Sequence, residues 1–299
     1  MNQVSEPRNI WGGNWTEEKL DTFEKYVNAY LTIMNAQKQK YNGWPTTIYF
    51  DGFAGSGKRT SSSDEEENNL FSDYLLKEEL EVYKGSAERV LSLTQKFDYY
   101  FFVDSDKSSI SSLEKIMKEK GIVNYNCYFV NDDVNNQLNK LSNFINDKKS
   151  ALVLLDPFGM QIDWSSIEKL KGKRVDLWIL IPSGVIINRF LDKKGKFLFK
   201  NKLESYFGLS QDEIKKKFYE TEQIETLFGS VDITNKTNDS VNKIAELYIE
   251  RLQSIWKFVS KKPLKLFNTK NVPIYHFVFA SNNQTAHKIA KQIIEKKSI

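Results

Sequence analysis

The 299-residue chain carries 43 lysines and arginines against 39 aspartates and glutamates, so its net charge is only +4. This near balance does not by itself indicate a nucleic-acid partner, although a local cluster of lysines could provide one. The hydrophobic content of 40% is sufficient for a large core. A single cysteine, Cys127, excludes an internal disulfide, and with only two histidines the composition argues against a protein-bound metal.

The N-terminus lacks the charged-then-apolar layout of a secretory signal, and no apolar run reaches membrane-spanning length. We therefore expect a soluble, cytoplasmic protein. Residues 15–39 carry apolar side chains at helical spacing, with Thr16 placed to cap the helix. We expect residues 1–45 to form a helical segment that packs on the core, and Cys127 to fill core space.

The chain is organised around residues 46–60. The apolar run 46–50 predicts a buried strand, and Asp51 and a glycine-rich loop with Gly52, Gly55 and Gly57 follow it. Such a loop lets the backbone approach a ligand closely. Two cofactor classes compete for the loop, a nucleoside triphosphate and S-adenosylmethionine, and a structural turn is the third interpretation.

The triphosphate interpretation depends on the G-x-x-x-x-G-K spacing from Gly52 to Lys58. Arg59 stands where a Mg²⁺-binding Ser or Thr belongs, and Thr60 comes one position late. Residues 61–69 are polar and acidic, so they lack the apolar periodicity of the helix that follows a P-loop. Their carboxylates would also repel phosphate. The sequence therefore disfavours this class.

S-adenosylmethionine fits the loop better. Residues 51–57, which include Phe53 and Ala54, are similar to the D-x-F-x-G-x-G loop of nucleic-acid amino-methyltransferases. In those proteins the loop surrounds an amino acid and a ribose, so neither a lysine nor a metal-binding hydroxyl is needed.

Further apolar runs predict strands at residues 97–104, 125–130, 151–155 and 175–181, and helical patterns at 86–96 and 108–120 alternate with the first of them. Strands that are apolar on both faces predict a parallel sheet covered by helices. Such a sheet binds ligands at the carboxyl ends of its strands. The acids at these ends are Asp51, Asp104, Asp132, Asp133 and Asp156.

Residues 190–260 form a long connection that we interpret as a helical insertion and as a candidate substrate or partner region. Its clearest helical patterns lie at 211–221 and 241–259. Lysine runs at 193–196, 215–217 and 261–262 favour contact with a phosphate backbone near the site.

After the insertion, residues 264–268 and 274–280 predict two antiparallel strands, and 285–297 a closing helix. The expected fold class is therefore α/β, a Rossmann-like class I methyltransferase fold with a mostly parallel sheet, a C-terminal antiparallel hairpin and a helical insertion. Its core would span residues 46–189, completed by 261–299.

Two acids are placed to bind the cofactor. Asp104, one strand over from the loop, could accept both hydrogen bonds from the ribose hydroxyls. Asp133 could accept from the adenine amino group, and Asp132 is a near-equal candidate.

The sequence Asp156-Pro157-Phe158-Gly159 resembles the [DNS]-P-P-[YFW] motif of amino-methyltransferases, and it matches the D-P-F-G of tRNA guanine dimethyltransferases more closely. An exocyclic amine of a base is a poor nucleophile. Hydrogen bonds from it to the Asp carboxylate and the Pro carbonyl withdraw its lone pair from conjugation. Phe158 could stack on the flipped base, with Trp164 as the alternative.

Together the motifs resemble the three-Cys-motif partner proteins, TcmP. The matching segments are Trp15 with Lys19 and Leu20, residues 51–57, 84–87, 133–135, 155–159, Gly184 with Asn188 and Arg189, and 273–280. The resemblance implies a methyltransferase-like fold and a partner protein that bears three cysteines. Trp15 and Lys19 are better interpreted as core and surface residues of a packing helix. Arg189 either contacts substrate or caps a helix.

The leading hypothesis is an S-adenosylmethionine-dependent N-methyltransferase that modifies a base in DNA or RNA with its three-cysteine partner. The competing hypothesis is a non-catalytic scaffold or sensor that acts through that partner in an antiphage or mobile-element module. A P-loop nucleotide-binding protein is the minor alternative.

Overall fold

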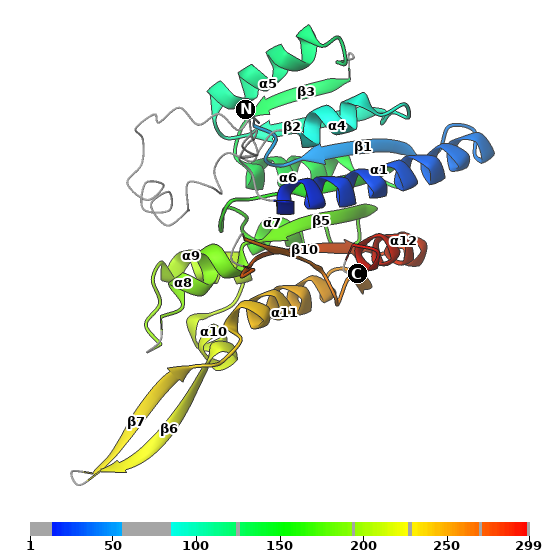
Figure 1. The fold of residues 1–299 in the computed structure, drawn as a ribbon. Coiled ribbons are helices and arrows are strands. Elements are labelled where there is room, and N and C mark those ends of the chain that lie inside the picture. The colour runs from blue at the N-terminus through cyan, green and yellow to red at the C-terminus, as the bar shows by residue number, and fades with distance from the viewer. Residues whose placement is uncertain are drawn as a thin grey trace, which may run out of the picture.

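A computed structural model describes residues 14–55, 85–123, 126–192, 195–226, 229–268 and 271–297. In this part of the chain an eight-stranded sheet has the order β3-β2-β1-β4-β5-β10-β8, and β9 also pairs with β10 (Figure 1). The strands are β1 (Thr46–Asp51), β2 (Tyr99–Asp104), β3 (Cys127–Asn131), β4 (Lys149–Leu155), β5 (Val175–Ile181), β8 (Phe258–Val259), β9 (Leu264–Phe267) and β10 (Pro273–Ser281).

The first five strands are parallel, and β10 runs antiparallel to β5, β8 and β9. Every residue of β5 is buried, because helices or other elements cover both faces of a central parallel strand. The expected α/β fold, a Rossmann-like class I methyltransferase sheet that is mostly parallel and ends in an antiparallel hairpin, is confirmed.

Helices flank the sheet. They are α1 (Asn14–Lys40), α4 (Ser86–Ser92), α5 (Lys107–Glu119), α6 (Val134–Phe144), α7 (Trp164–Glu168), α8 (Asn188–Phe190), α9 (Lys200–Phe207), α10 (Gln211–Phe218), α11 (Ser240–Gln253) and α12 (Gln284–Glu295), with a π-helical turn, η1 (Ser183–Ile187). Strands β2 and β3 are added on one side of β1, and β4 and β5 are added on its other side. Right-handed crossovers therefore place α4 and α5 on one face and α6 and α7 on the other. Helices α1 and α12 pack together on the α4 face (Figure 1).

Helix α1 is tied to the sheet by tyrosines on its buried face. The hydroxyl of Tyr26 donates to Asp176 on β5 at 2.8 Å, and that of Tyr30 donates to Ser150 on β4 at 3.1 Å. The ring of Tyr26 also meets Trp178 edge-on, with the centroids 5.4 Å apart. These contacts fix the helix across the parallel strands.

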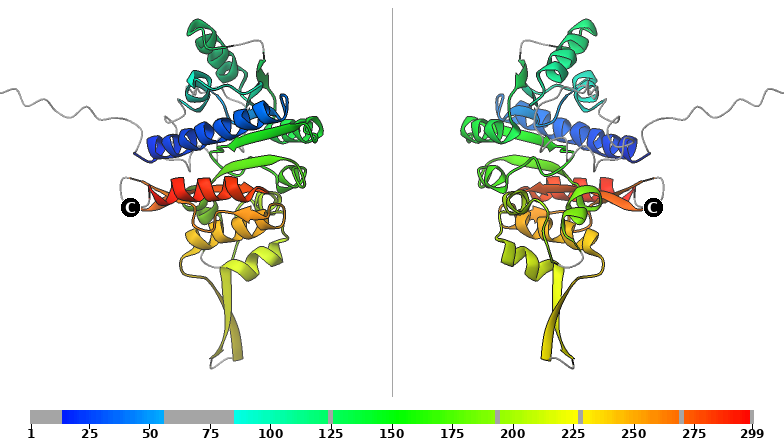
Figure 2. Two further views of the ribbon diagram at one scale, coloured as in Figure 1. Left: turned by 90° about the vertical axis from the view of Figure 1, so that its right-hand side faces the viewer. Right: turned by 90° about the vertical axis from the view of Figure 1, so that its left-hand side faces the viewer.

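Residues 190–260 are not purely helical. Helix α10 ends at Phe218 rather than at residue 221, and the chain continues into a hairpin of β6 (Tyr219–Thr226) and β7 (Gly229–Lys236). The hairpin projects away from the sheet (Figures 1 and 2). Helix α11 ends at Gln253, earlier than expected, because residues 258–259 pair with β10 instead.

Other differences from the sequence expectations are small. Helix α4 ends at Ser92 rather than at residue 96. Cys127 lies on β3 and is half-buried against the core rather than enclosed by it. Among the helices of the described segments, none combines the length and apolarity needed to cross a bilayer.

Candidate functional site

The carboxyl ends of β1, β2 and β4 lie at one edge of the sheet and bring three of the predicted acids together. Asp51 ends β1, Asp104 ends β2, and Asp156 directly follows β4. Strand β1 pairs with β2 on one side and with β4 on the other. The connections that leave β1 and β4 therefore run toward opposite edges of the sheet. Open α/β sheets bind their ligands at such a switch point.

Asp51 is fully buried and holds the start of the glycine loop. One oxygen accepts from the hydroxyls of Tyr49 (3.1 Å) and Ser86 (2.8 Å), and the other from the amide of Phe53 (3.2 Å). Burial raises the pKa of Asp51 from 3.8 to about 6, although these hydrogen bonds oppose the rise. The charge of Asp156 also raises it. Asp51 therefore joins the loop to the first turn of α4.

The glycines of the loop occupy positions where a side chain does not fit. A Cβ atom on Gly52 would lie 2.7 Å from Leu155 Cδ2 and 2.8 Å from Val134 Cγ2. On Gly55 it would lie only 2.3 Å from Asp104 Oδ2. Phe53 is half-buried and Ala54 buried between them. Gly57, Lys58 and the acidic tract of residues 61–69 lie outside the described residues.

Asp104 connects the loop to the next helix. Its Oδ2 accepts from the amide of Gly55 at 2.9 Å, and its Oδ1 accepts from the amide of Asp106 at 2.8 Å. Asp104 is half-buried. Asp104 thus lies beside the loop, and ribose binding stays a prediction.

Asp132 and Asp133 follow β3 at the same edge but differ in their surroundings. The oxygens of Asp132 accept from Asn136 (3.1 Å), Gln137 (2.6 Å) and Lys140 (3.0 Å). These contacts, the first two above all, hold the pKa of Asp132 far below its usual range. Asp133 is exposed and caps α6 through one hydrogen bond from the amide of Asn135 at 2.8 Å. Asp133 therefore has more capacity than Asp132 to accept hydrogen bonds from a ligand.

Asp156 is buried, with 3% of its surface exposed. Its Oδ2 accepts a hydrogen bond from Lys19 Nζ on α1, and the two side chains form a buried ion pair. Its Oδ1 is buried and has no hydrogen-bond partner among the described residues. In the rest of the motif, Pro157 and Gly159 are buried and Phe158 is half-buried.

The sequence interpretation of Lys19 as a surface residue is wrong, because only 3% of the residue is exposed. A local signal was present. Lys19 lies four residues before Phe23 and seven before Tyr26, so it belongs to the buried face of α1. Trp15 is a core residue, as expected, and its ring centroid lies 5.6 Å from Lys19 Nζ.

Trp164 does not offer a stacking face. It is 2% exposed, and Arg251 lies over its ring at 4.5 Å. Gly208 packs so closely that an added Cβ would lie 2.2 Å from the Trp164 ring. The structure thus corrects this candidate to a core residue, whereas Phe158 keeps an exposed portion. Arg189 is exposed on α8.

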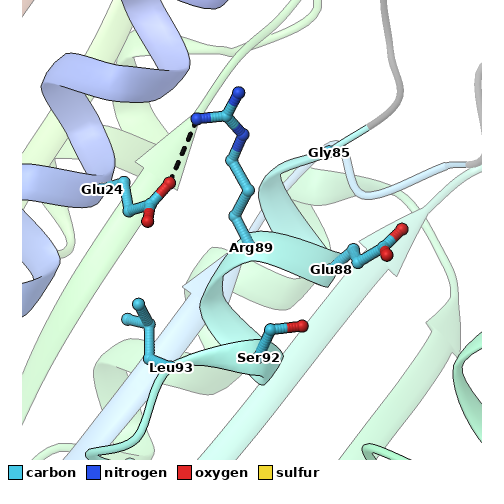
Figure 3. A pocket seen from close by; sticks show the side chains of 6 residues that line it. All are labelled: Glu24, Gly85, Glu88, Arg89, Ser92 and Leu93. Atoms are coloured by element: carbon cyan, nitrogen blue, oxygen red, sulfur yellow. Dashed lines mark hydrogen bonds and ion pairs between the residues drawn. The ribbon is translucent and has the colours of Figure 1, made fainter. Parts of the chain in front are cut away.

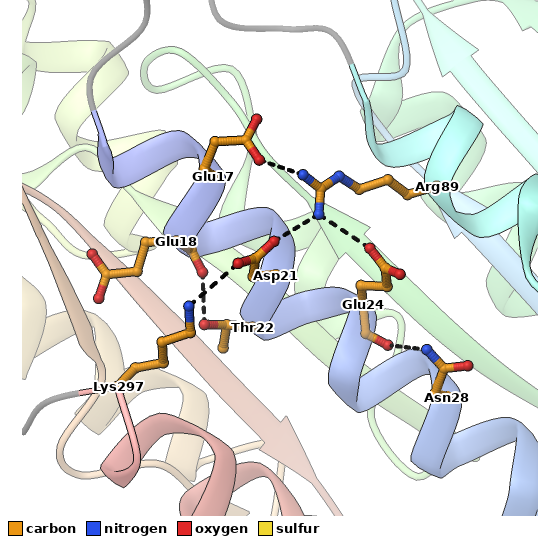
Figure 4. A network of polar contacts seen from close by, with 8 residues as sticks. All are labelled: Glu17, Glu18, Asp21, Thr22, Glu24, Asn28, Arg89 and Lys297. Atoms are coloured by element: carbon orange, nitrogen blue, oxygen red, sulfur yellow. Dashed lines mark hydrogen bonds and ion pairs between the residues drawn. The ribbon is translucent and has the colours of Figure 1, made fainter.

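A cavity of about 400 Å³ lies outside this site, between α1 and α4. Its lining residues are Glu24, Gly85, Glu88, Arg89, Ser92 and Leu93 (Figure 3). Arg89 reaches from α4 to Glu17, Asp21 and Glu24 on α1, and Lys297 donates to Asp21 from the other side (Figure 4). This network fixes α4, which carries Ser86, against α1.

No cluster of three or more His, Cys, Asp or Glu side chains suited to a metal ion occurs among the described residues. No family model matches the chain, and no curated protein matches it.

The chain resembles several solved structures at low identity. One is a Legionella pneumophila protein of the DUF519 family, with 17% identity, coverage of 91% of this chain and 98% of that chain, and a TM-score of 0.41. Another is an rRNA methylase from Streptococcus thermophilus, with 12% identity, 65% and 90% coverage, and a TM-score of 0.30. A third is the plantazolicin methyltransferase BamL, in complex with a triazolic desmethylPZN analog and SAH, with 10% identity, 90% and 88% coverage, and a TM-score of 0.30. Such distant similarities transfer no site, ligand or substrate to this chain.

The strand order itself defines the class. A doubly wound sheet with an antiparallel β10 beyond β5, and a glycine loop at its switch point, is a class I methyltransferase fold.

Proposed function

We propose that this protein is an S-adenosylmethionine-dependent N-methyltransferase that acts on an exocyclic amine of a nucleic-acid base. The observation that carries the proposal is the unpartnered Oδ1 of Asp156, buried at the end of β4 beside the glycine loop. A buried acceptor without a partner costs about 1–3 kcal/mol. An N–H group of a bound substrate would satisfy it.

The residues around the loop fit the cofactor. S-adenosylmethionine supplies a methyl group activated by its sulfonium. The backbone of residues 52–55 would lie along its amino acid and ribose, and the two glycines let this loop pack closely on Leu155, Val134 and Asp104. Asp104 would bind the ribose hydroxyls. Asp133 fits the adenine amino group better than Asp132, whose oxygens are occupied by α6.

Asp156, Pro157 and Phe158 would orient the substrate. The carboxylate of Asp156 and the carbonyl of Pro157 would accept hydrogen bonds from the amine, which directs its lone pair toward the methyl group. Phe158, half-buried at the site, would stack on the extruded base, a contact worth about 1–3 kcal/mol.

The charge distribution favours a polyanionic substrate. Residues 188–218 contain nine lysines and arginines against four acids, although the whole chain is nearly balanced. Helix α9 in this segment packs on α7, where Ser205 donates to Asp163 at 2.5 Å. Asp163 lies seven residues after Asp156 in the chain, and the basic segment would bind the phosphate backbone of the substrate.

Calorimetry decides the cofactor. We expect wild-type protein to bind S-adenosylmethionine, and Gly55→Ala to weaken binding at least ~10-fold, because the new Cβ displaces the Asp104 carboxylate. Gly121→Ala is the control for backbone strain alone: its φ is +65° and no atom lies within 4 Å of its Cβ position, so it should cost stability but leave cofactor binding unchanged. Binding of Mg·ATP without binding of S-adenosylmethionine would refute the proposal.

Transfer of a radiolabelled methyl group to unmodified DNA, tRNA and rRNA tests the reaction. We expect labelling by the wild type, its loss in Asp156→Ala, and its retention in Asp176→Asn, a buried acid that binds Tyr26 instead. The three-cysteine partner expected from the resemblance is tested in parallel. If such a partner copurifies and no nucleic acid is labelled even in its presence, the scaffold hypothesis replaces the enzyme.

A further inference from the structure

Helix α1 is attached to the sheet by three buried polar contacts on one face. Two are neutral hydroxyls, Tyr26 to Asp176 and Tyr30 to Ser150. The third is the ion pair of Lys19 with Asp156, at the end of the helix nearest the site. Anchoring alone does not require charge here, because the other two contacts achieve it without a cation.

Stability does not explain the ion pair. Both side chains are only 4% exposed, so both charges have lost their hydration. The attraction within such a pair often fails to exceed this desolvation cost, and a well-packed apolar pair is frequently as stable. The proximity of Asp51, a second buried carboxylate whose pKa Asp156 raises, increases the need for a cation. The pair is therefore better explained by what it does to Asp156.

The two oxygens of Asp156 are unequal. Lys19 occupies Oδ2, and Oδ1 has no hydrogen-bond partner in the described part of the chain. We infer that Lys19 is a positioning residue: it keeps Asp156 ionised and fixes its rotation, so that Oδ1 faces the incoming amine. This inference rests on the proposed function. A neutral Asp156 would carry a proton on one oxygen and bind the amine more weakly.

The test compares Lys19→Met with Tyr26→Phe. Both variants remove a buried polar anchor of α1, but only the first touches Asp156. In Lys19→Met we expect kcat for methyl transfer to fall on the order of 100-fold, as for loss of a preorganised polar group, with S-adenosylmethionine affinity unchanged. In Tyr26→Phe we expect kcat to remain within about threefold of the wild type. Equal kcat values in the two variants would overturn the inference.

Carbon-13 NMR of labelled aspartate gives a readout that needs no turnover. The Asp156 signal, assigned by its absence in Asp156→Asn, should move toward that of a neutral acid in Lys19→Met and stay in place in Tyr26→Phe. If the wild type transfers no methyl group, the proposed function fails, and this signal alone decides the role of Lys19. An unchanged Asp156 signal in Lys19→Met would overturn the positioning role of Lys19.

Lys19→Gln covers the case in which Lys19→Met does not fold. The glutamine amide can still donate to Asp156 but carries no charge. The same shift and the same fall in kcat are expected, and their absence would equally overturn the inference.

Discussion

Asp51 and His276 are buried side chains whose pKa values move in opposite directions. Burial raises the pKa of Asp51 from 3.8 to about 6. Burial, and then the charge of Lys265, lowers the pKa of His276 from 6.5 to about 4. His276 is held neutral between Ser183 at 2.7 Å and Asn242 at 3.3 Å. Between pH 4 and 6 the two residues therefore have opposing effects on stability.

The sign of each pH effect on stability follows from the number of protons that the group binds in the folded and in the unfolded state. In this window the folded protein holds a proton on Asp51 that the unfolded chain has lost, so the Asp51 contribution decreases as pH rises. The unfolded chain holds a proton on His276 that the folded protein lacks, so the His276 contribution increases as pH rises. The wild type should accordingly show only a weak net slope from these two groups.

Asp51→Asn should expose the His276 effect. The amide keeps the acceptor for Phe53 but does not titrate, so the free energy of unfolding should rise with pH by on the order of 2 kcal/mol more than in the wild type. Urea unfolding at pH 4.5 and 6 measures this difference. In His276→Asn only the Asp51 effect remains, so the free energy of unfolding should fall with pH relative to the wild type. The same change of unfolding free energy with pH in all three proteins would contradict the pKa shifts of Asp51 and His276.

Individual residues also show which positions could be predicted from the sequence and which could not. The positions of Asp51 and Asp156 at the carboxyl ends of buried strands could be predicted, because each stands where an apolar run stops. The partner of Asp156 could not, since Lys19 is 137 positions away in the chain. Trp164 was misplaced for a similar reason. Its short distance from the motif in sequence says nothing of Gly208 and Arg251, which enclose it from later elements.

At the scale of elements, the ion-pair network of Figure 4 fixes α4 to α1. Arg89 lies 2.5 Å from Glu17, 2.8 Å from Asp21 and 3.1 Å from Glu24, which recur on one face of the helix. Hydrogen bonding to Arg89 lowers the pKa of Asp21. The network is partly exposed, so solvent and salt screen it.

Arg89→Gln should therefore lower the free energy of unfolding by about 1 kcal/mol at low salt, and by less at high salt. Lys291→Gln is the matched control. It removes an exposed pair with Glu295 at 3.7 Å and should cost less than about 0.5 kcal/mol. Guanidinium is itself a salt, so urea unfolding with and without added NaCl is the measurement. A salt-independent loss in Arg89→Gln would argue against an electrostatic role.

Helix α10 presents Lys215, Lys216 and Lys217 to solvent, and Lys217 pairs with Glu250 at 2.9 Å. The double variant Lys215→Gln/Lys216→Gln should weaken RNA or DNA binding and reduce the slope of log affinity against log salt by about 1–2. Lys288→Gln/Lys291→Gln on α12 is the control with the same charge change. If both doubles reduce the slope equally, the basic segment has no special part in binding.

The hairpin β6–β7 is one of the elements that the sequence did not predict, as is the short strand β8. Residues 219–236 alternate polar and β-branched side chains without a clear apolar face, because the hairpin does not pack on the sheet (Figure 2). Its base is held locally instead. The hydroxyl of Tyr219 donates to the carbonyl of Asp192, and Lys236 donates to the carbonyls of Asn188 and Leu191. Contacts of this kind leave no periodic signal in a sequence.

At the scale of the whole molecule, the sheet could be predicted because its central strands are buried on both faces and therefore read as continuous apolar runs. Right-handed crossovers then explain why α6 and α7, which follow β3, lie on the opposite face from α4 and α5. The position of α1 is different. Its place across β4 and β5 depends on side-chain packing that no local pattern specifies.

The fold also predicts where a ligand should stabilise the protein. A cofactor at the switch point should slow amide hydrogen exchange at residues 51–55, 104–106 and 131–135, because these segments surround the site from three strands. At a concentration of 100 times Kd it adds about 2.7 kcal/mol to the stability of the folded state. The projecting hairpin, residues 219–226 and 229–236, should change little.

Hydrogen-exchange mass spectrometry with and without S-adenosylhomocysteine measures this pattern, with Gly55→Ala as the variant in which the slowing should diminish. ATP supplies the comparison ligand. Slowing that is confined to the cavity between α1 and α4, around Arg89 and Ser92, would instead place the ligand outside the sheet edge and remove Asp104 and Asp156 from its site.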